Sequence, residues 1–350
     1  MEDVKAQVRA SRSSISEQAR IDPTAVIVAD ELVVEDGAVV GPGCDLRSAR
    51  VHLGAGASVG AGSQVLAADV FRLGEGTRLD AHAQVVCREL VVGAGTYLGP
   101  RLQVGAGASM EEESLVSIGD RCQIAPDVLI NPTQPVRIGS DVGISPQVAL
   151  WTHGYHSGHP VREGHAATFA GVEIGDGVWL GFRSTVLPGV RVGAGTVVAA
   201  TATVTSSLPS QVLAAGVPAR VKRALTAQSL APDARAQAVE DLVHAWVERL
   251  RFKGMVVERT ERGWNIDEGQ GRAWSVSQQR ALTSMVGILP TRPRLGAEVL
   301  FDFGEPLRVT GKLDELGHDL RDFCRRATWY FPYPINSTGL VPHRFARLMD

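Results

Sequence analysis

Residues 172–223 read VEIGDGVWLGFRSTVLPGVRVGAGTVVAATATVTSSLPSQVLAAGVPARVKR. An aliphatic residue returns there at every sixth position: Ile174, Leu180, Val186, Val192, Val198 and Val204. Small residues follow most of these aliphatics. A period of six with this composition is typical of a parallel β-helix, in which each short strand buries one side chain and a small residue turns the corner. In an α-helix every sixth residue would fall on a different face, so no apolar stripe would form.

Weaker repeats extend the pattern toward the N-terminus. Aliphatic pairs six residues apart begin at Val34, Leu53, Leu73 and Val92, and these first members are 19, 20 and 19 residues apart. Each interval is close to three sixes plus a short insertion, so we expect three short strands in each coil. The pattern breaks at residues 132–135 and 151–171, and such interruptions are where a solenoid carries functional loops.

Length and composition limit the alternatives. The chain has 350 residues, 38 glycines and a net charge of −3, which fits one extended solenoid and a second small domain. No Lys/Arg block is interleaved with aromatic residues, which argues against a nucleic-acid partner. The four cysteines are far apart and form no C-x-x-C motif, so we expect buried thiols in a reducing compartment.

The chain carries no obvious targeting or membrane signal. Its first 20 residues have no apolar core segment of the kind found in secretory signals, and no run of about 18 apolar residues occurs. We therefore expect a cytoplasmic protein without a membrane span.

We predict three segments. Residues 1–24 are polar and suggest a helix or flexible arm, and residues 25–224 carry the β-helix. Residues 225–350 should form a small α+β domain, because an amphipathic helix near 232–254 precedes strand-like runs at 255–260, 274–277 and 298–303. A hairpin partner at 307–310 and a second helix around 316–323 complete it. This domain shows no catalytic motif, and packing, oligomerisation and acceptor selection are all open roles for it.

The excursion at 151–171 concentrates reactive side chains: Trp151, His153, Tyr155, His156, His159 and His165. Imidazole is a common zinc ligand and also the side chain best suited to removing a hydroxyl proton near neutral pH. The histidine spacings of 3, 3 and 6 match no compact zinc signature, and no cysteine or carboxylate pair lies beside them. We therefore expect no metal and favour a general base. For any single one of these histidines, an ordinary hydrogen-bonded loop residue is the alternative.

Residues 146–223 resemble the hexapeptide-repeat O-acetyltransferases of the galactoside and maltose acetyltransferase group, which also includes polysaccharide-modifying enzymes. The resemblance is carried by VEIGDGVWLG, VLPGVRVGAGTVV and AAGVPARVKR. It implies a left-handed parallel β-helix, a homotrimer with active sites between subunits, and acetyl-CoA as the acyl donor. The predicted fold is thus mainly β, a left-handed β-helix followed by the α+β domain.

The resemblance also assigns site residues. It implies that Trp179 lines the active site and that the backbone N–H of Phe182 faces the oxyanion, where preorganised donors stabilise developing charge. Trp151 and Tyr155, from the excursion, are expected to contact the acceptor. The residues expected to contact CoA lie in the last coils: Ala199, Ala200, Thr205, Gly216, Pro218, Arg220, Lys222 and Arg223. Corner packing of Trp179 and a solvated basic tail are the structural alternatives.

Two departures from the family pattern affect these assignments. The family often has T-K-D-I-P where this chain has Thr205 followed by SSLP, so one cationic contact to CoA is missing. The family's catalytic histidine falls at the offset of Tyr155, with His156 one place later and His153 two places earlier. His156 is the first choice for the base because it ends the THGYH run, and His153 is the alternative because it lies nearer the regular coil.

The resulting hypothesis is a CoA-dependent O-acyltransferase, acting with acetyl-CoA, that modifies a hydroxyl of a sugar or glycan precursor. A histidine base removes the hydroxyl proton and the oxygen attacks the thioester directly, because no cysteine or serine lies in an activated-nucleophile setting. N-acyl transfer to an amino sugar, a metal-dependent hydratase of the carbonic-anhydrase type and a non-catalytic scaffold are the alternatives. The sequence names neither the acceptor nor the acyl length.

Overall fold

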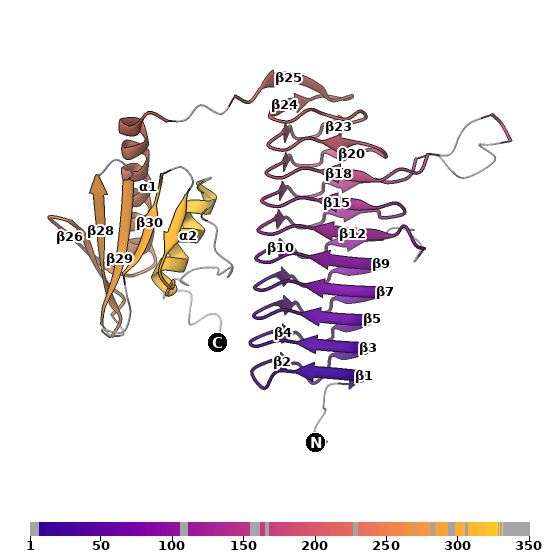
Figure 1. Ribbon diagram of the computed structural model, residues 1–350, viewed down its shortest axis with the longest axis horizontal. Helices are drawn as coiled ribbons and strands as arrows, with labels where there is room; N and C mark the ends of the chain where they lie inside the picture. The colour runs from indigo at the N-terminus through magenta and orange to yellow at the C-terminus, as the bar shows by residue number, and fades with distance from the viewer. Residues whose placement is uncertain are drawn as a thin grey trace. The chain divides into compact units, whose positions relative to one another are not determined.

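The structure is a computed structural model of the 350-residue chain. It describes residues 7–105, 111–154, 162–164, 168–226, 230–269, 271–280, 284–292, 298–304, 307–327, 329 and 331. The chain divides into two compact units between Thr226 and Ala227. The first unit is a parallel β-solenoid of about ten turns, consistent with the expected left-handed β-helix, and the second contains a sheet and helices (Figure 1).

One side of the solenoid is a sheet in which strands of successive coils pair in parallel. Two-residue strands build most of it: β2 (Arg20–Ile21), β4 (Val39–Val40), β6 (Ser58–Val59), β8 (Arg78–Leu79), β10 (Tyr97–Leu98), β13 (Gln123–Ile124), β16 (Gly143–Ile144), β19 (Trp179–Leu180) and β22 (Val197–Val198). β24 (Val212–Ala215) follows β22, and β25 (Arg220–Ala224) pairs antiparallel with β24 and ends the sheet.

The other two sides belong to a second sheet. In its first five coils one long strand passes through both sides: β1 (Gln7–Ile15), β3 (Val26–Val34), β5 (Asp45–Leu53), β7 (Gln64–Leu73) and β9 (Gln84–Val92). The sheet then divides into two rows. One row is β11 (Gln103–Val104), β14 (Leu129–Ile130), β17 (Ala149–Leu150), β20 (Thr185–Val186) and β23 (Thr203–Val204), and the other is β12 (Leu115–Ile118), β15 (Val136–Ile138), β18 (Val172–Ile174) and β21 (Arg191–Val192).

The six-residue repeat builds the core. The six repeated aliphatics from Ile174 to Val204 are at most 3% exposed, as are their counterparts in the coils from Val34 onward. Each coil thus adds a layer of inward side chains on top of the previous layer. Burying these side chains stabilises the fold by roughly 25 cal/mol for each Å² of apolar surface removed from water. The prediction of a β-helix core is confirmed.

Close packing at one corner explains the small residues. A β carbon on Gly119 would lie 2.7 Å from the carbonyl carbon of Gly139 in the next coil, a distance that real contacts do not show. Polar groups link the same corner from coil to coil. The Thr96 hydroxyl donates to the Gly119 oxygen (2.9 Å), and the Ser140 N–H donates to Asp176 Oδ1 (2.8 Å).

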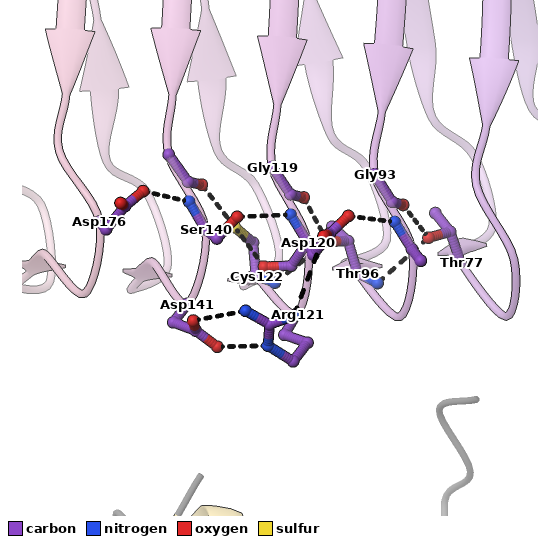
Figure 2. A network of polar contacts seen from close by, with 12 residues as sticks. Thr77, Gly93, Thr96, Gly119, Asp120, Arg121, Cys122, Ser140, Asp141 and Asp176 are labelled. Atoms are coloured by element: carbon purple, nitrogen blue, oxygen red, sulfur yellow. Dashed lines mark hydrogen bonds and ion pairs between the residues drawn. The ribbon is translucent and has the colours of Figure 1, made fainter. Parts of the chain in front are cut away.

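At other turn positions the left-handed backbone carries a side chain instead of glycine. Arg101 and Asp127 have φ values of 58° and 60° and form a two-point ion pair between successive coils (2.6 and 2.8 Å). Arg121 and Asp141 repeat this arrangement (Figure 2). The hydrogen bond from Arg101 holds the pKa of Asp127 below its usual value. These pairs offset part of the cost of a left-handed conformation in a non-glycine residue.

The N-terminal segment differs from expectation. A helix or flexible arm was expected for residues 1–24, but Gln7–Ile15 and Arg20–Ile21 are strands of the first coil. β1 pairs with β3 in a regular register from Gln7 with Val26 to Ile15 with Val34. Its side chains are mostly exposed, so the apolar signal of this coil is weak.

The second unit packs α1 (Pro232–Phe252) and α2 (Glu315–Arg326) with an antiparallel sheet in the order β26 (Val256–Thr260), β27 (Gly263–Asp267), β28 (Ala273–Arg280), β29 (Ser284–Arg292), β30 (Val299–Asp302) and β31 (Arg308–Thr310). β27 and β29 were not expected from the sequence. The apolar stripe of α1 is buried, and Trp246 at its centre donates a hydrogen bond to buried Asp319 (2.8 Å), which also pairs with Lys253. Among the described residues, no helix is long and apolar enough to cross a membrane.

Candidate functional site

The excursion after β17 begins as a short antiparallel pairing. His153 forms a bridge with Phe169, the Gly154 N–H donates to the Thr168 oxygen (2.8 Å), and the Ala170 N–H donates to the Thr152 oxygen (3.0 Å). Trp151 N–H still donates to Val186 of the next coil (2.9 Å). His153 therefore lies at the base of the excursion, where two chain segments and the coil hold its backbone.

Asn131 orients the imidazole of His153. Asn131 is fully buried, and its amide nitrogen donates to the Gly105 carbonyl (3.0 Å), so its Oδ1 faces Nδ1 of His153 at 2.9 Å. An amide oxygen can only accept, so Nδ1 carries the proton of the neutral ring and the lone pair is on Nε2. This is the tautomer that a base acting through Nε2 requires.

The Thr152 hydroxyl strengthens this arrangement. It donates to the backbone oxygen of Asn131 (2.8 Å) and accepts the Gln134 N–H (3.0 Å), so it ties the 132–135 break and its edge to the base of the excursion. The Thr133 hydroxyl also lies 3.0 Å from Asn131 Oδ1. The two interruptions of the repeat thus form one hydrogen-bonded cluster, defined here as the His153 cluster: Asn131, Thr133, Thr152 and His153.

Two aromatic rings flank the imidazole. The Trp151 ring meets it edge-on with centroids 5.4 Å apart, and the Phe169 ring lies 6.4 Å away at 32°. Phe169 is 45% exposed, so this side of the cluster offers an apolar surface to solvent. Such surfaces suit the C–H faces of sugars as well as other apolar groups.

A second group of site residues lies on the other sheet. Trp179 on β19 pairs in register with Val197, Val197 pairs with Leu213, and Leu213 pairs with Arg223 on β25. We call these four residues the Trp179 column. Three strand spacings separate its ends, a distance of roughly 14 Å. Trp179 is 50% exposed at the apolar end, and Arg223 is exposed at the cationic end.

Phe182 follows Trp179 at a corner of the coil. In four other coils this corner holds proline, at Pro42, Pro100, Pro126 and Pro146, and in three it holds alanine, each preceding a residue of positive φ. Proline fits because the N–H of this position is not used in the coil-to-coil hydrogen bonds. At Phe182 that N–H is present, and within the described residues it donates to no protein acceptor. The oxyanion-donor role that the resemblance implies for this N–H stays a prediction.

The last coil closes beside this corner. The Thr201 N–H donates to the Phe182 oxygen (2.7 Å), which places the Ala199-Ala200 step directly above Phe182. A β carbon on Gly181 would lie 2.5 Å from the Ala200 nitrogen, so the two corners are in close contact. The turn holding Gly216 and Pro218 is anchored on β23, because the Thr203 N–H donates to the Gly216 oxygen (3.1 Å).

The expected site residues thus fall into two groups. The Phe182 corner adjoins the expected CoA contacts Ala199 and Ala200, while exposed Arg220, Lys222 and Arg223 lie on β25. Thr205 is exposed just after β23. Trp151 and His153 form the other group, whereas Tyr155 and His156 lie outside the described residues. Asn131 and Phe169 were not expected. Asn131 had one signal, its place at the edge of the 132–135 break in the repeat.

The part of the chain that the structure describes contains no preformed set of metal ligands. No group of three or more His, Cys, Asp or Glu side chains is arranged there to hold an ion. His159 and His165 lie outside that part.

Comparisons with known proteins agree with this architecture. A family model described as bacterial transferase hexapeptide (six repeats) matches residues 171–206. The candidate lipopolysaccharide biosynthesis O-acetyl transferase WbbJ of Escherichia coli strain K12 is 31% identical over 134 residues, which are 35% of this chain and 68% of that protein. The chain belongs to the hexapeptide-repeat transferase family.

Other members of the hexapeptide-repeat transferases match a shorter part. The galactoside O-acetyltransferase of Escherichia coli strain K12 is 33% identical over 126 residues, 34% of this chain and 62% of that protein. The chain therefore spans less than two thirds of that relative's length. A solved galactoside acetyltransferase in complex with coenzyme A is 30% identical, with 39% of this chain and 64% of that chain covered and a TM-score of 0.33.

Proposed function

We propose that this hexapeptide-repeat transferase moves an acetyl group from acetyl-CoA to a hydroxyl of a sugar or glycan precursor. The observation that carries the proposal is the Trp179 column with the adjoining Phe182 corner. CoA has phosphates at one end and a thioester at the other, joined by an extended arm. A cationic end at Arg223 and an apolar end at Trp179 suit such a ligand.

The acceptor hydroxyl needs a base, and a histidine of the excursion supplies it. The hydrogen bond that His153 Nδ1–H donates to Asn131 Oδ1 supports His153 in this role, because it fixes the neutral tautomer with its lone pair on Nε2. His156 is the competing residue. The base takes the hydroxyl proton, the oxygen attacks the thioester carbon, the Phe182 N–H stabilises the tetrahedral oxyanion, and the CoA thiolate departs and is protonated.

The donor and acceptor groups lie on different sides of one coil. His153 follows β17 in one sheet, whereas Trp179 lies on β19 in the other. We infer that a homotrimer completes the site, with the His153 cluster of one subunit facing the Trp179 column of the next. Closed cyclic symmetry is a common outcome for heterologous contacts of this kind.

Release of free thiol tests the proposal. With acetyl-CoA and a panel of sugars, including galactosides, maltose and amino sugars, thiol release above the hydrolysis background is expected with at least one hydroxyl acceptor. Mass spectrometry of the product distinguishes an ester from an amide. Release only with amino sugars, as an amide product, would replace O-acylation by N-acylation.

A further inference from the structure

Gly143 is unusual among the outward-facing residues of its sheet. The equivalent positions of the other coils all carry a side chain: Arg20, Val39, Ser58, Arg78, Tyr97, Gln123, Trp179, Val197 and Leu213. Gly143 lies in a strand, not in a turn, and its φ lies outside the left-handed region. Backbone conformation therefore does not require glycine here, and glycine weakens a strand.

The indole of Trp179 accounts for the missing side chain. Gly143 pairs in register with Trp179, and a β carbon on Gly143 would lie 2.4 Å from Cε3 and 2.7 Å from Cζ3 of that ring. The benzene part of the indole thus occupies the space that any other residue at 143 would fill. A β carbon there would force the ring to another rotamer.

The coil that contains Gly143 also contacts the group beside a second aromatic ring of the site, Phe182. Arg183 places its guanidinium 5.0 Å from the centroid of the Phe182 ring, and its Nε donates to Gln147 Oε1 (2.6 Å). Gly143 and Gln147 therefore fix, from one coil, the two aromatic side chains at the apolar end of the Trp179 column. Phe182 and Trp179 are 42% and 50% exposed, so both rings keep a free face.

We propose that Gly143 is a positioning residue for acyl-CoA binding: it seats the Trp179 indole so that the free face of the ring meets the thioester end of the donor. This inference rests on the proposed function. Gly143 acts through Trp179 and does not itself touch the ligand.

A double-mutant cycle tests the proposal. The variants are Gly143→Val, Trp179→Ala and the double variant, with Gln123→Val as the matched control one coil away in the same row. Gly143→Val should raise KM for acetyl-CoA about tenfold, a coupling within the range for residues in contact. Its thermal unfolding midpoint should not fall, because valine favours strands. In the Trp179→Ala background the same substitution should leave KM unchanged, and Gln123→Val should behave as wild type.

A structural readout separates this proposal from the assigned function. With 5-fluorotryptophan incorporated, the ¹⁹F resonance that disappears in Trp179→Phe belongs to Trp179. Gly143→Val should move this resonance, and Gln123→Val should not. An unmoved resonance, or an equal rise in KM with and without Trp179, would overturn the positioning role. If the wild-type protein binds no CoA, the proposed function fails, and the resonance still decides whether Gly143 seats the ring.

Discussion

Asn131 Oδ1 accepts a hydrogen bond from Nδ1 of His153 across 2.9 Å, although the two residues are 22 positions apart. The contact joins the two places where the six-residue repeat is interrupted. It also leaves the lone pair of the neutral imidazole on Nε2, which supports the proposed role of His153 as the base.

His153→Ala should therefore lower kcat by about 10²- to 10⁴-fold, the usual cost of a lost general base. CoA affinity should stay near the wild-type value, because the histidine acts on the acceptor. His156→Ala is the comparison and should have a smaller effect. Steady-state kinetics and calorimetry check both variants. A slow His156→Ala with an active His153→Ala would give the role to His156, and a loss below tenfold in both would exclude histidine base catalysis in this excursion.

Asn131→Ala should lower kcat by about tenfold with little change in KM for acetyl-CoA, since His153 then loses the partner that fixes its tautomer and orientation. Part of any effect will be structural, because the buried Thr152 and the Gly105 carbonyl lose a partner too. Thr133→Val is the control, because the Thr133 hydroxyl lies 3.4 Å from His153 Nδ1 and its contact with the imidazole is weak. Equal kcat losses in the two variants would show that Asn131 has no special part in orienting the imidazole.

The cysteines should be inert in the folded protein. Burial raises the pKa of Cys87 to about 12 and that of Cys122 to about 11, so the reactive thiolate is scarce near neutral pH. Burial also raises the pKa values of Cys44 and Cys324. At about pH 8, a thiol reagent should modify these residues only after unfolding and should not inhibit transfer. Rapid labelling of one thiol together with loss of activity would instead favour a covalent acyl-enzyme.

The assembly should be a trimer of about three times 37.2 kDa. Light scattering at micromolar concentration measures the mass directly. A monomer at that concentration would remove the intersubunit site. Mixing inactive His153→Ala subunits with inactive Trp179→Ala subunits provides a stricter test, because mixed trimers should regain activity at interfaces that carry neither substitution.

The sequence predicted the coil core because its signal is strictly local. Ile174 and its successors point inward every six residues, and the coils after the first repeat the same burial. The first coil escaped prediction because β1 has a neighbour on one side only and exposes most of its side chains, so little apolar pattern is left. In the second unit, β27 had a usable signal, since Trp264 and Ile266 alternate with polar residues and are buried.

The site was less accessible to sequence reasoning. The places of Trp179 and Phe182 in a regular coil followed from the six-residue repeat, whereas their roles rest on the family resemblance and stay predictions. His153 was expected only as the alternative base, because the contact that orients its ring involves Asn131, which reaches it only when two successive coils stack. The need for glycine at position 143 is likewise a property of the stacked neighbour, Trp179, and has no trace in the local sequence.

The central claim is that the Trp179 column binds CoA, and isothermal titration calorimetry of CoA tests it most directly. The account predicts one CoA bound per chain. It also predicts that replacing both Arg220 and Arg223 by Ala weakens binding about tenfold at low salt, with a smaller effect at high salt, because exposed cation–phosphate contacts are screened. Absence of binding heat at several temperatures, with the folded state verified by circular dichroism, would contradict the account and favour a non-catalytic scaffold.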